Sequence, residues 1–262
     1  MAKILVIGGS LGGLFAANIL LRQGHDVTLL EKAVGSLDGR GAGIVTHDAL
    51  ADALREAGIA VDDSLGVAVS KRVTLGIDGE SLGEMSLPQI LTSWSRLYHL
   101  LKENFPSERY LQGKNVKAVS QGSNSVQVTC EDGSTYQAEL LIASDGIRSA
   151  VRAQVAPAIQ PEYAGYIAWR GVCDESHLSN HTLDTLFNYF GFCLPNGEQM
   201  LGYPVAGPGN DTRPGKRRYN FVWYRPAPEG QALQSLMTDA DGVHHPLGLP
   251  PNKVSWRHLA AS

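Results

Sequence analysis

The first residues that could do chemistry form a glycine-rich turn, Gly8-Gly9-Ser10-Leu11-Gly12-Gly13. The turn matches the Gly-x-Gly-x-x-Gly pattern at Gly8 and Gly13, with Ser10 at the middle position. Such a turn offers unpaired backbone N–H groups and the positive end of a helix dipole to a phosphate. The alternative is a glycine turn that only lets a helix pack closely on a strand.

An acidic residue at the right distance favours the phosphate interpretation. Glu31 follows the short apolar run Val27 to Leu30, where a carboxylate can accept hydrogen bonds from the hydroxyls of an adenosine ribose. The combination indicates an adenine dinucleotide, NAD or FAD rather than NADP, because an acid favours a free 2′-hydroxyl. A solvated acid that merely ends a strand is the alternative.

The elements around these residues predict the fold class. Ile4 to Ile7 is expected to form a strand buried on both faces, Leu14 to Leu21 a helix that Gly24 ends, and Val27 to Leu30 a second strand. This βαβ unit requires parallel strands with a right-handed crossover. A helix is expected over Trp94 to Phe105, and strands predominate after Tyr166.

A second motif follows a further buried strand, Leu140 to Ala143. It reads Asp145-Gly146-x-x-Ser149-x-x-Arg152 and resembles the Asp-Gly motif of the group A flavoprotein monooxygenases, the FAD-dependent aromatic hydroxylases. A strand-to-helix turn capped by Asp145 explains only part of it. Six stretches also resemble, in the same order, members that hydroxylate dihydroxypyridines: Gly8 to Leu14, Gly39 to Val45, Tyr163 to Tyr166, Trp169 to Val172, Tyr203-Pro204 and Leu236 to Asp239.

This resemblance implies an α/β fold, with a Rossmann-type FAD-binding domain built on a parallel sheet and a β-rich substrate domain. The expected FAD-binding domain is discontinuous, over residues 1–66 and 92–156. The expected substrate domain takes residues 67–91 and 157–262 and is incomplete. Trp169 and Arg170 are expected to pack between the domains.

The resemblance also implies the cofactor-binding residues. Gly8, Ser10 and Gly13 would hold the FAD pyrophosphate, and Glu31 the ribose. Asp145 and Arg152 would help bind FAD and the passing NADH or NADPH. The full expected set is Gly8, Ser10, Leu11, Gly13, Glu31, Lys32, Arg40, Arg96, Asp145 and Arg152.

The implied reaction is hydroxylation of an electron-rich hydroxylated pyridine or aromatic ring, with O2 and NAD(P)H, through a flavin hydroperoxide shielded from water. A nearby group would help ionise the substrate hydroxyl. The catalytic base is not identified, and His47, Tyr189 and Tyr203 are the candidates. Each has a structural alternative, since tyrosines in sheets usually pack and His47 stands at an expected helix start.

One family feature is missing from this sequence. The third FAD motif, a Gly-Asp pair well beyond the Asp-Gly motif, occurs nowhere in the 262 residues. We therefore expect a C-terminally truncated chain, either a cleavage product or a natural short form. The competing hypothesis is an inactive dinucleotide-binding fragment that serves as a binding or interaction module.

Composition excludes several other classes. The formal net charge is −4 and no block of like charges occurs, which argues against nucleic acid and membrane surfaces as partners. The three cysteines lack the spacing of a metal or redox site, so no metal is expected and a reducing cytoplasm is the expected compartment. A small aromatic or hydroxypyridine substrate and O2 are the expected partners, with a homodimer as a candidate assembly.

Overall fold

The start of the chain folds as the predicted strand–helix–strand unit. Strand β1 (Lys3–Ile7), helix α1 (Leu11–Arg22) and strand β2 (Asp26–Leu30) follow one another, and the two strands pair in parallel. The structure is a computed structural model and describes residues 1–37, 43–250 and 253–255. Gly24 follows the C-cap residue Gln23 of α1 with a φ of +87°, which suits a glycine.

The unit belongs to a four-stranded sheet that is parallel throughout. Strand β10 (Leu140–Ala143) pairs with β1 on one side, and β6 (Tyr110–Leu111) extends the sheet beyond β2, giving the order β10-β1-β2-β6. The carboxyl ends of β1 and β10 therefore lie side by side. This arrangement brings the glycine turn after β1 next to the Asp-Gly motif after β10.

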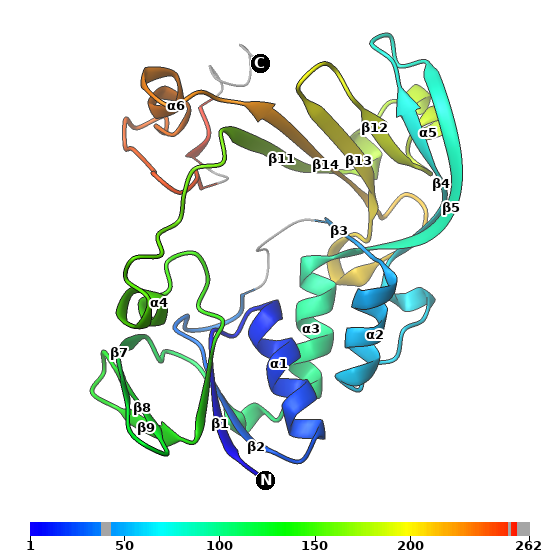
Figure 1. The fold of residues 1–262 in the computed structure, drawn as a ribbon. Coiled ribbons are helices and arrows are strands. Elements are labelled where there is room, and N and C mark those ends of the chain that lie inside the picture. Colours follow the sequence, from blue (N-terminus) through cyan, green and yellow to red (C-terminus); the bar gives the residue numbers. More distant parts are fainter. Residues whose placement is uncertain (38–42, 251–252, 256–262) are drawn as a thin grey trace.

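Both faces of the parallel sheet are covered (Figure 1). Ile4 and Val6 point into a core shared with α1, α2 (Asp48–Glu56) and α3 (Trp94–Asn104). Leu5 and Ile7 point to the other face, where the core is completed by α4 (Ala150–Val155) and a three-stranded antiparallel sheet. The strands of that sheet are β7 (Val116–Gln121), β8 (Val126–Cys130) and β9 (Thr135–Ala138).

A second, mixed sheet of seven strands forms the other lobe, with the order β11-β14-β13-β12-β4-β5-β3. Only the β12–β4 pair is parallel. We call this sheet the roof. Its strands are β3 (Gly43–Val45), β4 (Val67–Leu75), β5 (Ser81–Ser93), β11 (Tyr166–Asp174), β12 (Phe190–Cys193), β13 (Gln199–Val205) and β14 (Arg218–Pro226).

Short helices complete the described chain. They are α5 (Asn180–Thr185), α6 (Gln231–Leu236) and the 3-10 turns η1 (Asp63–Leu65), η2 (Ser107–Arg109), η3 (Glu175–His177) and η4 (Pro208–Asn210). None of the described helices is long and apolar enough to cross a membrane.

The predicted α/β class and parallel βαβ unit are confirmed. Strand β3 was not anticipated as part of the roof: Gly43 to Val45 lie within the expected FAD-binding segment, yet they pair with Ser93 to Leu91 of β5. The expected domain boundaries stay a prediction. Strand β12 begins at Phe190, because Phe187 ends a turn after α5 and is buried, with 1% of its surface exposed.

Candidate functional site

Two glycines of the turn after β1 have no room for a side chain. Gly8 has φ +99°, and a Cβ there would lie 2.3 Å from the carbonyl oxygen of Ser144. A Cβ on Gly13 would lie 1.8 Å from the carbonyl oxygen of Gly8. The absence of side chains at both positions lets the start of α1 pack closely on the ends of β1 and β10. Gly13 therefore contributes to the site through this close packing.

The N-terminus of α1 opens beside this turn. Ser10 is the N-cap residue, but its side chain makes no capping hydrogen bond. The first N–H groups of a helix have no partner within the helix, and the exposed Ser10 hydroxyl is free to join them. The position can therefore bind an anion through backbone groups, the helix dipole and one hydroxyl.

Glu31 is held in place rather than solvated. The residue is 5% exposed, and its carboxylate accepts hydrogen bonds of 2.7 Å from the backbone N–H groups of Gly9 and of Ala33. A carboxylate offers roughly four acceptor positions. The two that remain are available to the hydroxyls of a ligand.

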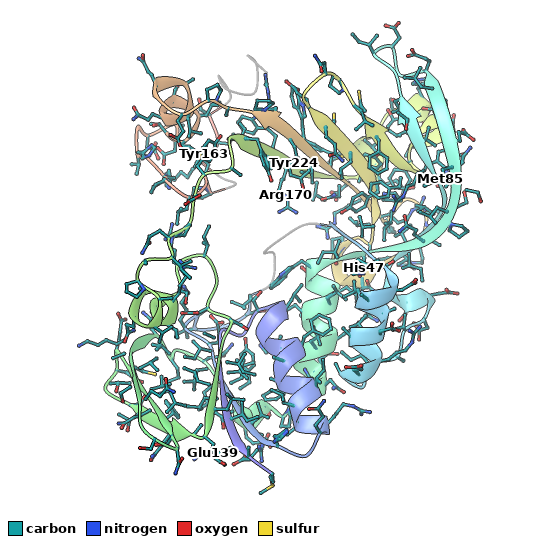
Figure 2. All side chains as sticks on the ribbon, in the orientation of Figure 1. His47, Met85, Glu139, Tyr163, Arg170 and Tyr224 are labelled. Carbon is teal, nitrogen blue, oxygen red and sulfur yellow. The ribbon has the colours of Figure 1, made fainter. Side chains whose placement is uncertain are left out.

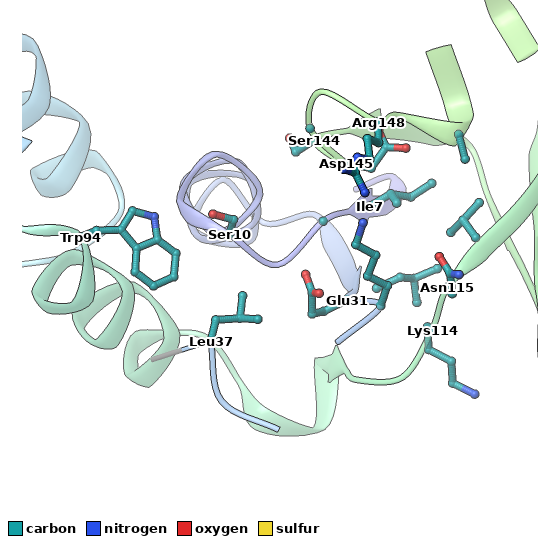
Figure 3. Close-up of a pocket in the computed structure, with 16 residues that line it drawn as sticks. Ile7, Ser10, Glu31, Leu37, Trp94, Lys114, Asn115, Ser144, Asp145 and Arg148 are labelled. Carbon is teal, nitrogen blue, oxygen red and sulfur yellow. The ribbon is translucent and has the colours of Figure 1, made fainter. Parts of the chain in front are cut away.

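Glu31 lies on the wall of a cavity of about 190 Å³. Figure 3 shows Trp94 and Leu37 at one end of this pocket, Lys114 and Asn115 at the other, and Glu31 between them. The lining residues are Ile7, Gly8, Ser10, Leu30, Glu31, Lys32, Leu37, Trp94, Lys114, Asn115, Val116, Ser144, Asp145, Gly146, Arg148 and Ala150. The pocket thus joins the glycine turn, the acid of β2 and the Asp-Gly motif.

Asp145 lines both this pocket and a second, neighbouring pocket. Its Oδ2 accepts a hydrogen bond from the N–H of Val151 in the first turn of α4, at 3.3 Å. Arg152 lies in the second hollow, with Gly12 and Asp145, and donates to the carbonyl oxygen of Ile147. The structure therefore places Asp145, but not Arg152, at the pocket that holds Glu31.

Two other expected cofactor residues, Leu11 and Arg96, do not line the pocket. The side chain of Leu11 packs against the core around α1, so only its backbone faces the site. Arg96 donates from Nη2 to the hydroxyl of Ser64 at 3.0 Å, on η1. Arg40 lies outside the described residues. The cofactor contacts of the whole expected set stay predictions.

The expected set omits five polar or aromatic residues of the pocket: Trp94, Lys114, Asn115, Ser144 and Arg148. Lys114 and Asn115 follow β6, which is the strand next to β2. Residues that follow neighbouring parallel strands lie at the same edge of the sheet. The strand order β2-β6 could therefore have placed Lys114 and Asn115 next to Glu31. With only two residues, β6 shows no hydrophobic pattern from which a strand could be predicted.

The three base candidates lie in different surroundings, and their catalytic role stays a prediction. His47 is the exposed N-cap of α2, and its Nδ1 accepts a hydrogen bond from the N–H of Leu50, which leaves the proton of a neutral ring on Nε2. The Lys71 ammonium lies over the ring of Tyr189, 4.3 Å from the ring centroid. Burial raises the pKa of Tyr203 to about 12, so its hydroxyl stays protonated at neutral pH.

One face of the roof carries both charged and apolar side chains. Strand pairing places Arg170, Val222 and Leu201 in one row across β11, β14 and β13. Arg170 is exposed and points into the space between the lobes (Figure 2). Trp169 is only partly buried, and the expected packing of Trp169 and Arg170 between the domains stays a prediction.

The pocket meets the requirements of an adenine dinucleotide. It combines a helix N-terminus for the phosphates, a fixed carboxylate with free acceptor positions for the ribose and a partly apolar wall that includes Leu37 and Trp94. The residues present thus fit the adenosine and pyrophosphate parts of FAD.

Comparisons with known proteins agree with this geometry. An FAD binding domain model matches residues 1–210, and an FAD binding domain-like model matches residues 163–261. The chain is 34% identical over 257 residues to 2,6-dihydroxypyridine 3-monooxygenase of Paenarthrobacter nicotinovorans, covering 98% of this chain and 64% of that protein.

Solved structures show the same fold. The structure of 2,6-dihydroxypyridine-3-hydroxylase from Arthrobacter nicotinovorans matches with a TM-score of 0.89 and 33% identity, over 99% of this chain and 65% of that one. Klebsiella pneumoniae HpxO complexed with FAD and uric acid matches at 0.71 and 25% identity, over 88% of this chain and 58% of that one. The chain thus spans less than two thirds of the length of these relatives, and it belongs to the FAD-binding monooxygenase family.

Proposed function

We propose that this chain is the FAD-binding and substrate-sheet portion of a monooxygenase that hydroxylates an electron-rich hydroxylated pyridine or aromatic ring, using NADH or NADPH and O2. The observation that carries the proposal is the buried Glu31 carboxylate, fixed by two backbone N–H groups on the wall of a pocket that also contains Asp145. Similarity over nearly the whole chain to a dihydroxypyridine monooxygenase supports it.

In this proposal each part of the pocket has one task. Glu31 binds the ribose hydroxyls, and Ser10 and the first N–H groups of α1 bind the pyrophosphate. Asp145 lies beside them, and its carboxylate accepts one hydrogen bond from the first turn of α4. Bound FAD supplies the reduction and oxygen chemistry of the reaction.

The roof supplies shielding and orientation. Tyr203 is 3% exposed and packs edge-on against Phe190, with ring centroids 5.0 Å apart. Because the hydroxyl of Tyr203 stays protonated, it serves as a hydrogen-bond donor to a substrate oxygen rather than as a base. The free guanidinium of Arg170 favours the ionised form of a substrate hydroxyl that approaches it.

Glu31→Gln tests the assignment of the ribose site. A glutamine directs an amide N–H₂ at Gly9 or Ala33, so one of two hydrogen bonds is lost and the ribose acceptor with it. We expect FAD affinity, measured by fluorescence titration, to fall about tenfold or more. Glu139→Gln is the control, because Glu139 lies at the opposite end of the sheet and accepts only from the N–H of Lys3 (Figure 2).

Activity is tested separately with purified protein loaded with FAD. The proposal predicts that 2,6-dihydroxypyridine accelerates NADH or NADPH oxidation and yields a hydroxylated product. FAD binding without any acceleration supports the competing function, an inactive dinucleotide-binding module. Failure of the wild-type chain to bind FAD contradicts the proposed monooxygenase. A Glu31→Gln variant that binds FAD as tightly as the wild type contradicts the assignment of the ribose site.

A further inference from the structure

A pocket lies at the end of the roof where β13 begins. Its lining includes Gln199 of β13, Tyr224 of β14 and Tyr166 of β11. Gln199 pairs directly across the sheet with Tyr224. Tyr224 is two residues from Val222, which pairs with Arg170, and residues two apart on a strand share a face. Tyr224 and Gln199 therefore lie on the same face of the roof as Arg170 (Figure 2).

Two tyrosines give this pocket an aromatic wall. The rings of Tyr166 and Tyr224 meet edge to face, with centroids 5.9 Å apart and ring planes at 74°. Tyr166 remains 49% exposed, so its ring has surface left for a ligand. A flat aromatic ring suits such a wall, because it can pack against one tyrosine and meet the other with its edge.

Gln199 brings an unused amide to this wall. The residue is half-buried, and no other residue in the described part of the chain hydrogen-bonds to its side chain. The other glutamine of the roof, Gln89, uses both ends of its amide, since Oε1 accepts from Arg72 and Nε2 donates to the carbonyl oxygen of Thr46. An amide offers an acceptor oxygen and a donor nitrogen side by side. Gln199 can therefore pair with a ligand edge that carries one donor next to one acceptor.

Arg170 lies across the same face from Gln199. The two residues are two strands and one row apart, about 12 Å between their Cα atoms for strands spaced by about 4.8 Å. Burial raises the pKa of Tyr203, the Arg170 charge opposes this rise and Tyr224 adds to it, so these three polar ends lie near one another. A six-membered ring packed on Tyr224 can thus reach the Gln199 amide with one edge and Arg170 with the neighbouring substituent.

We propose that Gln199 determines ring specificity by binding the lactam edge of a hydroxypyridine in its pyridone form. The ring N–H donates to Oε1 of Gln199, and the adjacent ring carbonyl oxygen accepts from Nε2. The second ring oxygen, ionised, faces the Arg170 guanidinium. A benzenoid ring has a C–H group in place of the ring N–H, so it forms only one of the two hydrogen bonds. This role of Gln199 rests on the proposed function and narrows its substrates from aromatic rings in general to hydroxypyridines.

Ligand binding to the FAD-loaded chain tests this role without requiring turnover. Titration calorimetry compares 2,6-dihydroxypyridine with resorcinol, the benzenoid ring that carries the same two hydroxyl groups. Gln199→Leu keeps the approximate size of the side chain and removes both hydrogen-bonding atoms. Each hydrogen bond contributes about a factor of five, so this variant should lose about 25-fold in affinity for 2,6-dihydroxypyridine and about fivefold for resorcinol. Equal losses for the two rings overturn the proposal, and so does an unchanged affinity for 2,6-dihydroxypyridine.

Tyr224→Leu provides the contrasting variant. It removes the ring on which either ligand packs and leaves the Gln199 amide in place, so both affinities should fall by the same factor. A loss confined to 2,6-dihydroxypyridine would assign the recognition of the lactam edge to Tyr224 and overturn the role of Gln199.

Met200→Ala is the matched control for Gln199→Leu. Met200 follows Gln199 on β13 and is 39% exposed, but successive residues of a strand point to opposite faces. This variant should change neither affinity. If it lowers the affinity for 2,6-dihydroxypyridine as much as Gln199→Leu does, distortion of β13 accounts for both losses and the proposal fails.

The wild-type titrations distinguish the two levels of inference. If the FAD-loaded wild-type chain binds neither ring, the proposed function fails first. If it binds 2,6-dihydroxypyridine and Gln199→Leu binds that ring equally well, only the role of Gln199 is overturned.

Discussion

At the scale of single residues, the glycines at the start of α1 differ in what a side chain would meet. A methyl group on Gly13 would lie 1.8 Å from a backbone oxygen, whereas one on Gly12 meets nothing closer than the Ser144 hydroxyl at 4.0 Å. We predict that Gly13→Ala lowers the free energy of unfolding by about 3 kcal/mol or more and abolishes FAD binding.

Gly12→Ala is the matched control for that prediction. It adds the same methyl group in the same turn of the helix. Alanine is also more favourable in a helix than glycine by about 1 kcal/mol. Urea unfolding should therefore show equal or higher stability for Gly12→Ala. Equal losses in the two variants would contradict the assignment of Gly13 to close packing.

The spacing of single residues located the functional residues that follow β1, β2 and β10, but not those that follow β6. Gly8, Glu31 and Asp145 follow strands that the hydrophobic pattern marks clearly, so their meeting at one sheet edge could be predicted. Trp94 lines the same pocket from the start of α3. No periodicity indicates that this helix turns its first residue toward the glycine loop, because tertiary packing decides that orientation.

At the scale of elements, a buried ion pair joins η3 to the start of β14. Glu175 is 7% exposed, accepts from the N–H groups of Gly215 and Arg217, and pairs with the Arg217 guanidinium at 2.7 Å. The Arg217 hydrogen bond lowers the pKa of the Glu175 carboxyl below its usual value of 4.5. The guanidinium also stacks on Phe187, 4.6 Å from the ring centroid.

Glu175→Gln should lower the free energy of unfolding at neutral pH by about 2 kcal/mol. A carboxyl with a lowered folded-state pKa stabilises the fold above the ordinary pKa and loses that contribution as the pH falls through the folded-state value. The difference between wild type and variant should therefore shrink below pH 4.5. Urea titrations at neutral and acid pH measure it.

The exposed pair of Lys71 and Glu84 provides the comparison for Glu175. Glu84 is 49% exposed in its side chain, and solvated pairs contribute about 0–1 kcal/mol. Glu84→Gln should thus have little effect at either pH. A pH-independent loss in Glu175→Gln would show that packing, not charge, carries the contribution of that residue.

Most elements could be predicted from their own residues, since the parallel strands are apolar on both faces and Asp78-Gly79 marks the β4–β5 hairpin. The place of β3 could not. Three residues carry no period, and their partner strand lies almost fifty positions away. The side chains that contact Gly43, those of Asn220 and Tyr203, are still more distant in sequence.

At the scale of the whole molecule, the described residues bury separate apolar cores in the two lobes. The clusters on the two faces of the parallel sheet share no buried residue with the roof cluster of Val69, Leu91, Phe190, Tyr203 and Val205. The lobes meet where β5 approaches α3 and where β4 and β5 approach η1. Cooperative unfolding depends on such shared cores, and these lobes share little of one.

We therefore predict two transitions in scanning calorimetry of the wild-type chain. FAD at about a hundred times its Kd should stabilise the lobe that binds it by about 2.7 kcal/mol and raise mainly that transition. A single transition that FAD moves as a whole would mean that the two lobes unfold together.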